Sequence, residues 1–314
     1  MKRNENVDKE IVGEYPPQFE TKNRLKALKV IKFFSRSLDY FVLILSIIAM
    51  LICLYAFFDT HKIFEVASTQ SYQMYKPNSK DRLSFKELAD INKDVIGWID
   101  VYGTQIDYPI VQGKDNTEYL NKTVLGEFST VGSIFLDSGN EKDFSDFKNI
   151  LYGHYMEKRK MFGDMELFKD ENFFNTHKYG CLYRVNNSTK GITFFSLVDT
   201  VGTDFKLLSP TKTYNKEIIS YIYEHSIFKR NIEITKEDKI IMLDTCNLTQ
   251  TNGRYVLVGK LTDKVEKNTF KENDKEDKFS KYFNKLYTFD FLKIILFLWL
   301  LVLILYMIYK NFYN

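Results

Sequence analysis

Three residues with reactive side chains stand at the ends of predicted β-strands. Cys246 directly follows the apolar stretch 240–245, and Arg254 opens the next strand-like run, 255–261. If these two runs pair through the short loop between them, the thiol and the guanidinium come out at the same end of a sheet. His154 follows another short apolar run in the same way. Strand ends and their loops are where a rigid scaffold presents reactive groups.

A thiol, an imidazole and a guanidinium can together carry out acyl transfer. A thiolate is a strong nucleophile, and neighbouring cations favour its formation. A histidine can hand a proton to a leaving amine, and an arginine can bind a developing oxyanion. Taken singly, a cysteine at a strand end is more often a small apolar residue, and a lone histidine is more often structural. Residue types and spacing therefore make a Cys246/His154/Arg254 site a hypothesis.

Short runs rich in β-branched and aromatic residues recur through the middle of the chain, and their number predicts a closed or nearly closed β-barrel. They are 106–111, 133–136, 149–152, 182–185, 192–198, 239–243 and 255–261. Predicted helices are fewer: 84–91, for which Ser84 and Glu87 form a capping box, 161–168, and the longest, 214–228. The expected class is mainly β with flanking helices.

Composition excludes several kinds of protein. The chain has 314 residues, with 44 Lys and Arg against 41 Asp and Glu, so its net charge of +3 does not indicate a nucleic-acid binder. Its 3 cysteines cannot form a disulfide framework and lack metal-ligand spacing. We therefore expect neither a bound metal nor a nucleic-acid partner.

The stretch 40–58 carries no charge and would span about 28 Å as a helix, close to the thickness of a bilayer core. No small-residue cleavage site follows it, so we interpret it as a retained transmembrane anchor. The cations Lys22, Arg24, Lys26, Lys29, Lys32 and Arg36 precede it without an acid among them. The positive side of a span stays in the cytoplasm, so the residues after it are expected outside the cell.

A second apolar stretch, 294–309, lies between Lys293 and Lys310, whose side chains can reach the two membrane interfaces. It predicts a second span, with a short amphipathic helix packed on the barrel as the alternative. Both termini are then expected in the cytoplasm. The predicted organisation is a basic cytoplasmic segment 1–39, a transmembrane helix 40–58, an extracellular stalk 59–81, a folded domain 82–263, a charged linker 264–290, a second transmembrane helix 291–309 and a cytoplasmic tail 310–314.

Several ordered motifs resemble the signature segments of sortases, and most closely those of class B. They are Leu-Tyr-Gly-His at 151–154, Met-Phe-Gly-Asp at 161–164, Leu-Asp-Thr-Cys at 243–246, Gly-Arg at 253–254 and Val-Gly-Lys-Leu at 258–261. The approach to the domain is also similar to that class, with Gly-Trp-Ile at 97–99 and Asp-Tyr-Pro-Ile-Val at 107–111. The resemblance covers roughly 84–262, the whole predicted domain.

The resemblance implies a sortase-type closed β-barrel and a cysteine transpeptidase at the membrane of a Gram-positive cell, with its catalytic domain outside. Cys246 would attack the threonine carbonyl of a carboxyl-terminal sorting signal on a surface protein and form a thioacyl enzyme. His154 would protonate the leaving amine and Arg254 would steady the oxyanion. The amine of a peptidoglycan precursor or cross-bridge would resolve the intermediate. No cofactor is implied, and the bilayer is the expected further partner.

The sequence departs from the family pattern in places that bear on substrate binding. Tyr155 stands where relatives often have asparagine, and Asp244 where serine is common; with Thr245 and Tyr223 they are the expected substrate-binding residues. A carboxyl-terminal span is commoner in pilus-building class C sortases, but their Asp-Pro-aromatic lid is absent from this sequence. A pilin-polymerising sortase and a Cys/His peptidase that releases the cleaved protein are the alternative functions.

Overall fold

The computed structural model describes residues 18–68, 72–77, 85–186, 188–246, 251–270 and 291–313. The chain forms two compact units, residues 1–57 with 282–314, and residues 58–281. The second unit contains the described strands and all the residues of the predicted site.

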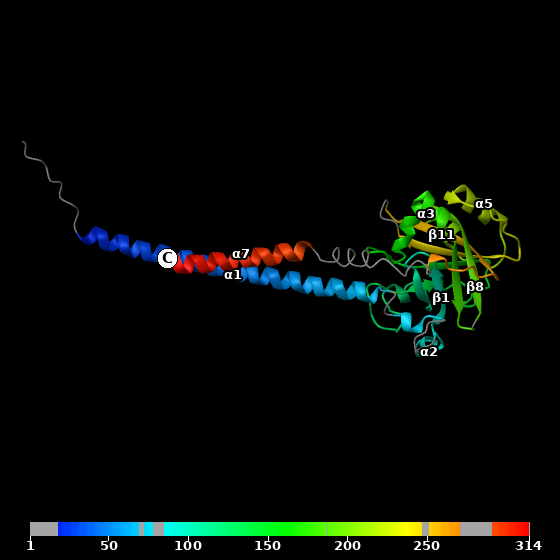
Figure 1. Ribbon diagram of the computed structural model, residues 1–314, viewed down its shortest axis with the longest axis horizontal. Helices are drawn as coiled ribbons and strands as arrows, with labels where there is room; N and C mark the ends of the chain where they lie inside the picture. Colours follow the sequence, from blue (N-terminus) through cyan, green and yellow to red (C-terminus); the bar gives the residue numbers. More distant parts are fainter. Residues whose placement is uncertain are drawn as a thin grey trace, which may run out of the picture. The chain divides into compact units, whose positions relative to one another are not determined.

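The strands among the described residues are β1 (Val95–Val101), β2 (Asp107–Val111), β3 (Ile134–Leu136), β4 (Lys148–Tyr152), β5 (Tyr155–Met156), β6 (Lys160–Met161), β7 (Tyr179–Arg184), β8 (Thr189–Val201), β9 (Ser226–Lys229), β10 (Lys239–Cys246) and β11 (Gly253–Thr262). Nine of them form one sheet in the order β11-β10-β4-β3-β2-β1-β7-β8-β9, and β11 also pairs with β8. This last pairing closes eight strands into the barrel seen in Figure 1, with β9 attached to β8 outside the ring. The predicted closed barrel is therefore confirmed.

The described helices are α1 (Gln18–Val66), α2 (Phe85–Ile91), α3 (Glu171–Thr176), α4 (Phe205–Leu208), α5 (Lys216–Glu224) and α7 (Phe291–Tyr313), with the 3-10 turns η2 (Gln73–Tyr75), η3 (Glu118–Leu120) and η4 (Gly163–Lys169). α5 begins where the Asn215 side chain accepts hydrogen bonds from the amides of Glu217 and Ile218. It lies at the outside of the barrel (Figure 1) and buries Ile218 and Ile222 against it.

The hydrophobic core has two sides because the central strands are covered on both faces. Along β10, Ile241 and Leu243 belong to the cluster that fills the barrel, whereas Ile240 and Met242 belong to the cluster beneath α5. Successive side chains on a strand point to opposite faces, so a strand covered on both faces is apolar at consecutive positions. This explains why 240–243 shows no alternation of apolar and polar residues.

Each of the seven predicted strands overlaps an observed one, but the helices differ in their limits. The helix predicted over 214–228 ends at Glu224, and the chain continues as strand β9. Phe228 in β9 packs on the barrel-filling cluster and contacts the Phe174 ring, so tertiary packing takes these residues out of the helix. The helix predicted at 161–168 is the 3-10 turn η4. The proposed cap Ser84 lies outside the described residues.

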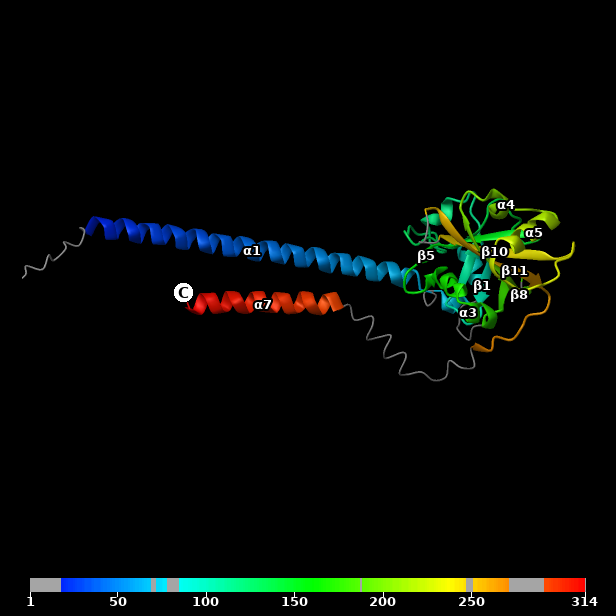
Figure 2. The same cartoon turned by 90° about the horizontal axis from the view of Figure 1, so that it is seen from above.

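The described residues of the first unit belong to two apolar helices, of which α1 continues beyond the unit to Val66. α1, at 49 residues, is the one helix of the described residues that is long and apolar enough to cross a membrane. The apolar part of α7, Phe297–Lys310, is shorter. The two helices lie side by side (Figure 2), and Lys310 of α7 forms an ion pair with Asp39 of α1.

Candidate active site

The pairing of β4, β10 and β11 brings the three predicted catalytic residues to one edge of the barrel. β4 runs parallel to β10, with Tyr152 opposite Asp244, so His154 and Cys246 both follow two residues later. β11 runs antiparallel to β10 and places Arg254 opposite Cys246. Positions two apart on a strand share a face, and so do paired positions on neighbouring strands.

A cavity of about 640 Å³ opens at this edge. It is lined by Asn116, Leu120, Phe135, Asp137, Tyr152, Gly153, His154, Gly202, Phe205, Leu208, Ser209, Pro210, Asp244, Cys246 and Arg254. The volume falls in the range of sites that hold small ligands or short peptide segments. Three predicted catalytic residues and one predicted substrate-binding residue, Asp244, therefore share one cavity.

The three reactive side chains differ in exposure. Cys246 is exposed and its thiol is free, whereas Arg254 is 28% exposed and has a buried Nε without a hydrogen-bond partner among the described residues. His154 is half-buried, and its Nε2 lies 3.2 Å from the Leu120 carbonyl oxygen. Because a carbonyl can only accept, this contact places a proton on Nε2. The thiol is thus open to a substrate while the imidazole is oriented by the protein.

Gly153 lets the chain leave β4 and reach His154. A Cβ at this position would lie 2.5 Å from Cδ1 of Ile134 and 2.6 Å from Cδ2 of Phe162. Both neighbours belong to the barrel-filling core, which is tightly packed. A side chain at position 153 would therefore displace the histidine or the core beneath it.

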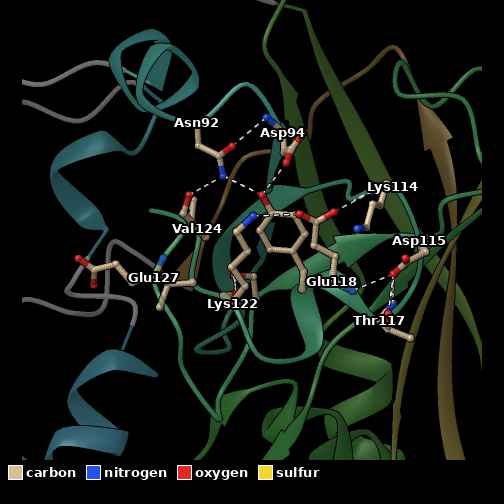
Figure 3. Close-up of polar contacts among 12 residues, drawn as sticks. Asn92, Asp94, Lys114, Asp115, Thr117, Glu118, Lys122, Val124 and Glu127 are labelled. Atoms are coloured by element: carbon tan, nitrogen blue, oxygen red, sulfur yellow. Dashed lines mark hydrogen bonds and ion pairs between the residues drawn. The ribbon is translucent and has the colours of Figure 1, made fainter.

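The wall that contacts His154 is held by a polar network around η3 (Figure 3). The Tyr119 hydroxyl donates to the Asp94 carboxylate at 2.8 Å and accepts from the Asn92 amide at 2.9 Å. The Glu118 carboxylate accepts from Lys122 Nζ at 2.9 Å. Since these bonds hold the residues on both sides of Leu120, its carbonyl is a rigid partner for the imidazole.

Another part of the cavity wall is the short helix α4, which is held by side chains at both ends. Asp204 caps its start by accepting from the Leu207 amide, and Lys148 Nζ donates to the carbonyls of Lys206 and Leu207, each at 2.9 Å. Lys148 is fully buried, and burial lowers its pKa to about 8 although the Asp204 carboxylate opposes this shift. α4 contributes Phe205 and Leu208 to the cavity lining.

We expect Lys148→Met to lower the free energy of unfolding by about 2 kcal/mol, because the carbonyls of Lys206 and Leu207 lose their donor and Leu207 is fully buried. Looser attachment of α4 should also raise the KM for a peptide substrate. The matched control is Lys212→Met, since Lys212 is 67% exposed and pairs with Glu141 at the surface; this change should leave the free energy of unfolding almost unchanged. Urea unfolding of both variants measures the difference, and equal stabilities would contradict the anchoring role.

Asp244 is the most unusual group in the cavity. It is 1% exposed, and neither carboxylate oxygen has a hydrogen-bond partner among the described residues. Arg254 Nη1 lies 3.5 Å from Oδ2. Burial raises the pKa of Asp244 to about 7, and the nearby Arg254 charge works in the opposite direction.

The other three predicted substrate-binding residues do not line this cavity. The Tyr155 hydroxyl donates to the Glu166 carboxylate at 2.7 Å, outside the cavity. Thr245 is fully buried. Tyr223 packs in the cluster beneath α5, with its hydroxyl donating to the Ile232 carbonyl. Within the described ranges, no group of acidic, histidine and cysteine side chains could hold a metal ion.

Several cavity residues were not expected from the sequence. Asp137 directly follows the buried strand β3. A polar residue at the end of a predicted strand is the signal that pointed to His154, so the same signal could have identified Asp137. Leu120, Phe205 and Leu208 carry no such signal, because they come from connections between strands. Only the folded chain brings them to the edge where β4 and β10 end.

Two sequence relatives are both named sortase B. The chain is 33% identical to that of Listeria monocytogenes over 192 residues, which is 60% of this chain and 77% of the relative. It is 30% identical to that of Staphylococcus aureus over 200 residues, 61% of this chain and 81% of the relative. No protein-family model matches the chain.

Solved structures agree with these relatives. A class B sortase of Streptococcus pyogenes involved in pilus biogenesis aligns with a TM-score of 0.54 and 37% identity, over 56% of this chain and 97% of that one. Clostridium perfringens sortase B gives 0.53 and 40%, over 57% and 99%. A complex of Staphylococcus aureus sortase B with substrate gives 0.52 and 31%, over 56% and 83%, and a sortase B complexed with triglycine gives the same score and identity over 56% and 84%.

The barrel, the motifs and both sets of similarities agree. The two relatives are at least 30% identical and are covered over more than two thirds of their length. The solved structures from Streptococcus pyogenes and Clostridium perfringens are covered almost completely. This chain therefore belongs to the class B sortases, which are cysteine transpeptidases.

Proposed function

We propose that this sortase cleaves the carboxyl-terminal sorting signal of surface proteins after threonine and transfers the protein to an amine of peptidoglycan. The observation that carries the proposal is the cavity that joins His154, Cys246 and Arg254 at one edge of the barrel. An exposed thiol beside an oriented imidazole and a guanidinium is suited to acyl transfer through a covalent intermediate.

In the first half of the reaction, the Cys246 thiolate adds to the threonine carbonyl carbon. The Arg254 guanidinium stabilises the developing oxyanion. Arg254 lies opposite Cys246 in the register of β10 and β11. The carbon–nitrogen bond then breaks, and the leaving amine takes a proton from His154. The product is a thioacyl enzyme on Cys246 and a free carboxyl-terminal fragment.

In the second half, an amine attacks the thioester carbonyl and the carbon–sulfur bond breaks. His154 accepts the proton that the amine loses, so the imidazole returns to its starting state. Cys246 leaves as thiolate. The net change is exchange of one amide for another, and the protein supplies all the proton transfers.

The solved relatives support both halves by analogy. One Staphylococcus aureus sortase B structure holds a substrate, and another sortase B structure holds triglycine, which offers an amino group. The Streptococcus pyogenes relative is involved in pilus biogenesis, and this favours a second candidate, in which the amine belongs to a pilin. A peptidase that releases the cleaved protein to water would share the first half-reaction.

Intact mass spectrometry tests the proposal. The full chain in detergent micelles is incubated with a library of sorting-signal peptides, without an amine, then with triglycine and then with a lysine-bearing pilin peptide. An added acyl mass on the enzyme, discharged by an amine to give a new amide, is the expected result. Discharge only to water would indicate a peptidase, and no acyl mass with any peptide would contradict the proposal.

We further propose that α1 and α7 both cross the membrane, with both chain ends in the cytoplasm. The basic residues before position 40 favour a cytoplasmic amino terminus. Asp39 stands at the start of the uncharged stretch of α1 and Lys310 at the end of that of α7. Their ion pair would bring two charges to the same interface, where each compensates the other.

Reporter fusions at the carboxyl terminus test this topology. Green fluorescent protein fused after Asn314 should fluoresce, because it folds in the cytoplasm. Alkaline phosphatase fused at the same position should be inactive, because it becomes active only outside the cytoplasm. The matched control ends the chain after Thr262, at the end of β11, where the reporters should behave in the opposite way. An active phosphatase after Asn314 would contradict a second span.

A further inference from the structure

Asp244 has a buried carboxylate that the proposed mechanism does not use. It lies on β10 two residues before Cys246 and therefore on the same face of the strand. It is 1% exposed, yet both of its oxygens lack a hydrogen-bond donor among the described residues. A buried carboxylate without donors is costly, so its presence at this position calls for a partner.

Of the described groups that surround Asp244, Arg254 is the one that can serve as its charged partner. From β4, the Tyr152 hydroxyl is turned to Asp137, to which it donates at 2.9 Å. From the end of β4, His154 Nε2 is turned to a backbone carbonyl, and from β10 Cys246 offers a thiol. From β11, Arg254 Nη1 lies 3.5 Å from Asp244 Oδ2, the one ion pair of Asp244 among the described residues.

Asp137 shows that an acid in this cavity need not lack donors. It is 5% exposed and lines the same cavity. Its carboxylate accepts from the Asn116 side chain, the Gly139 amide and the Tyr152 hydroxyl, all within 2.9 Å. The Asp137 carboxylate therefore has its hydrogen-bond donors. Among the described residues, Asp244 has no hydrogen-bond donor, and its one charged neighbour is the Arg254 guanidinium, whose buried Nε is also without a partner there.

We propose that Asp244 is a positioning residue for Arg254, holding its guanidinium on the face of the barrel that carries Cys246. This inference rests on the proposed function. Arginine has a long side chain that loses rotational freedom when it is fixed. The Asp244 carboxylate lies on β10, next to the strand that carries Arg254 and two residues before Cys246. Its attraction holds the guanidinium in one place before substrate binds, so little freedom remains to be lost when the oxyanion forms.

The role has a pH dependence because only the ionised carboxylate attracts the guanidinium strongly. Burial raises the pKa of Asp244 to about 7, so the ionised fraction grows as the pH rises through neutrality. The contribution of Asp244 to the free energy of unfolding falls over the same rise in pH. A carboxyl whose pKa is raised by folding contributes stability that is complete below its unfolded pKa and is lost as the pH rises through the folded one.

Asp244→Asn separates the two effects, since it keeps the shape and removes the charge. At pH 8 we expect kcat/KM for peptide cleavage to fall about 10- to 100-fold through kcat, with KM within about twofold of the wild-type value. The thermal midpoint of the same variant should be equal to or above that of the wild type at pH 8. A loss of activity by unfolding would lower the midpoint instead.

A double-mutant cycle with Arg254→Ala, on the full chain in detergent micelles, decides the mechanism. If Asp244 acts through Arg254, Asp244→Asn should change kcat/KM less than about twofold in the Arg254→Ala background. A full loss in that background would overturn the proposal. The changes in thermal midpoint should also be non-additive at pH 8, and additive changes would overturn the positioning role of Asp244. This stability test does not need peptide cleavage. A wild type that cleaves no peptide would refute the proposed function alone.

Discussion

Cys246→Ala is expected to abolish acyl-enzyme formation and to lower peptide cleavage by about four orders of magnitude or more. The thiol is exposed and, among the described residues that line the cavity, is the one nucleophilic sulfur. Alanine removes the atom that forms the covalent bond while leaving the strand pairing with β11 in place. The remaining histidine and arginine cannot form a thioester.

The measurement is the mass of the enzyme after incubation with a cleavable peptide, together with the rate of cleavage. Cys181→Ala is the matched control, because Cys181 is also a free cysteine in a strand but lies buried in β7, away from the cavity. It should form the acyl enzyme at a rate within about threefold of the wild type. Cleavage that persists in Cys246→Ala would overturn the assignment of the nucleophile.

His154→Ala is expected to lower kcat/KM by about three orders of magnitude, since a positioned acid and base contributes roughly that much. The half-buried ring is aligned by its bond to the Leu120 carbonyl. His154→Gln can keep a donor to that carbonyl but cannot transfer a proton. Both variants should therefore be similarly impaired, and added imidazole should restore part of the rate in the alanine variant.

His225→Ala is the control for this prediction. His225 ends α5 and its ring contacts Tyr221, so it lies outside the cavity lining. Its removal should change kcat/KM by less than about twofold. If His154→Gln retained most of the activity, the histidine would serve to shape the cavity and a different group would have to move the proton.

Much of the barrel could be predicted from the sequence because its strands are short, apolar and rich in β-branched residues. The run 239–243 predicted β10, and 255–261 predicted β11, each within a few residues of the observed limits. β1 was missed although it is buried along its whole length. The end of α5 was placed too late because the apolar residues of β9 continue the helical spacing, and only packing of Phe228 reveals the change.

The site could be predicted in part for the same reason. His154, Cys246 and Arg254 each stand at the end of a predicted strand, and the motifs around them resemble one family. Tyr155, Thr245 and Tyr223 were also expected to bind substrate, but they do not line the cavity: the Tyr155 hydroxyl bonds to Glu166, Thr245 is fully buried, and Tyr223 of α5 packs in the cluster that this helix covers. Along β10 the side chains alternate, so Thr245 points to the face opposite to that of Asp244 and Cys246, whereas the surroundings of Tyr155 and Tyr223 depend on tertiary packing.

The element types, the long apolar helix near the amino terminus and the residues capable of acyl transfer could be read from local composition and periodicity. The grouping of these residues depends instead on which strands pair in the fold. The parallel pairing of β4 with β10 brings His154 to Cys246 across about ninety intervening residues, and the β8–β11 pairing closes the barrel. Strand pairing also buries Asp244 beside Arg254, with no hydrogen-bond donor to its carboxylate among the described residues, since burial and charge pairing depend on which strands become neighbours.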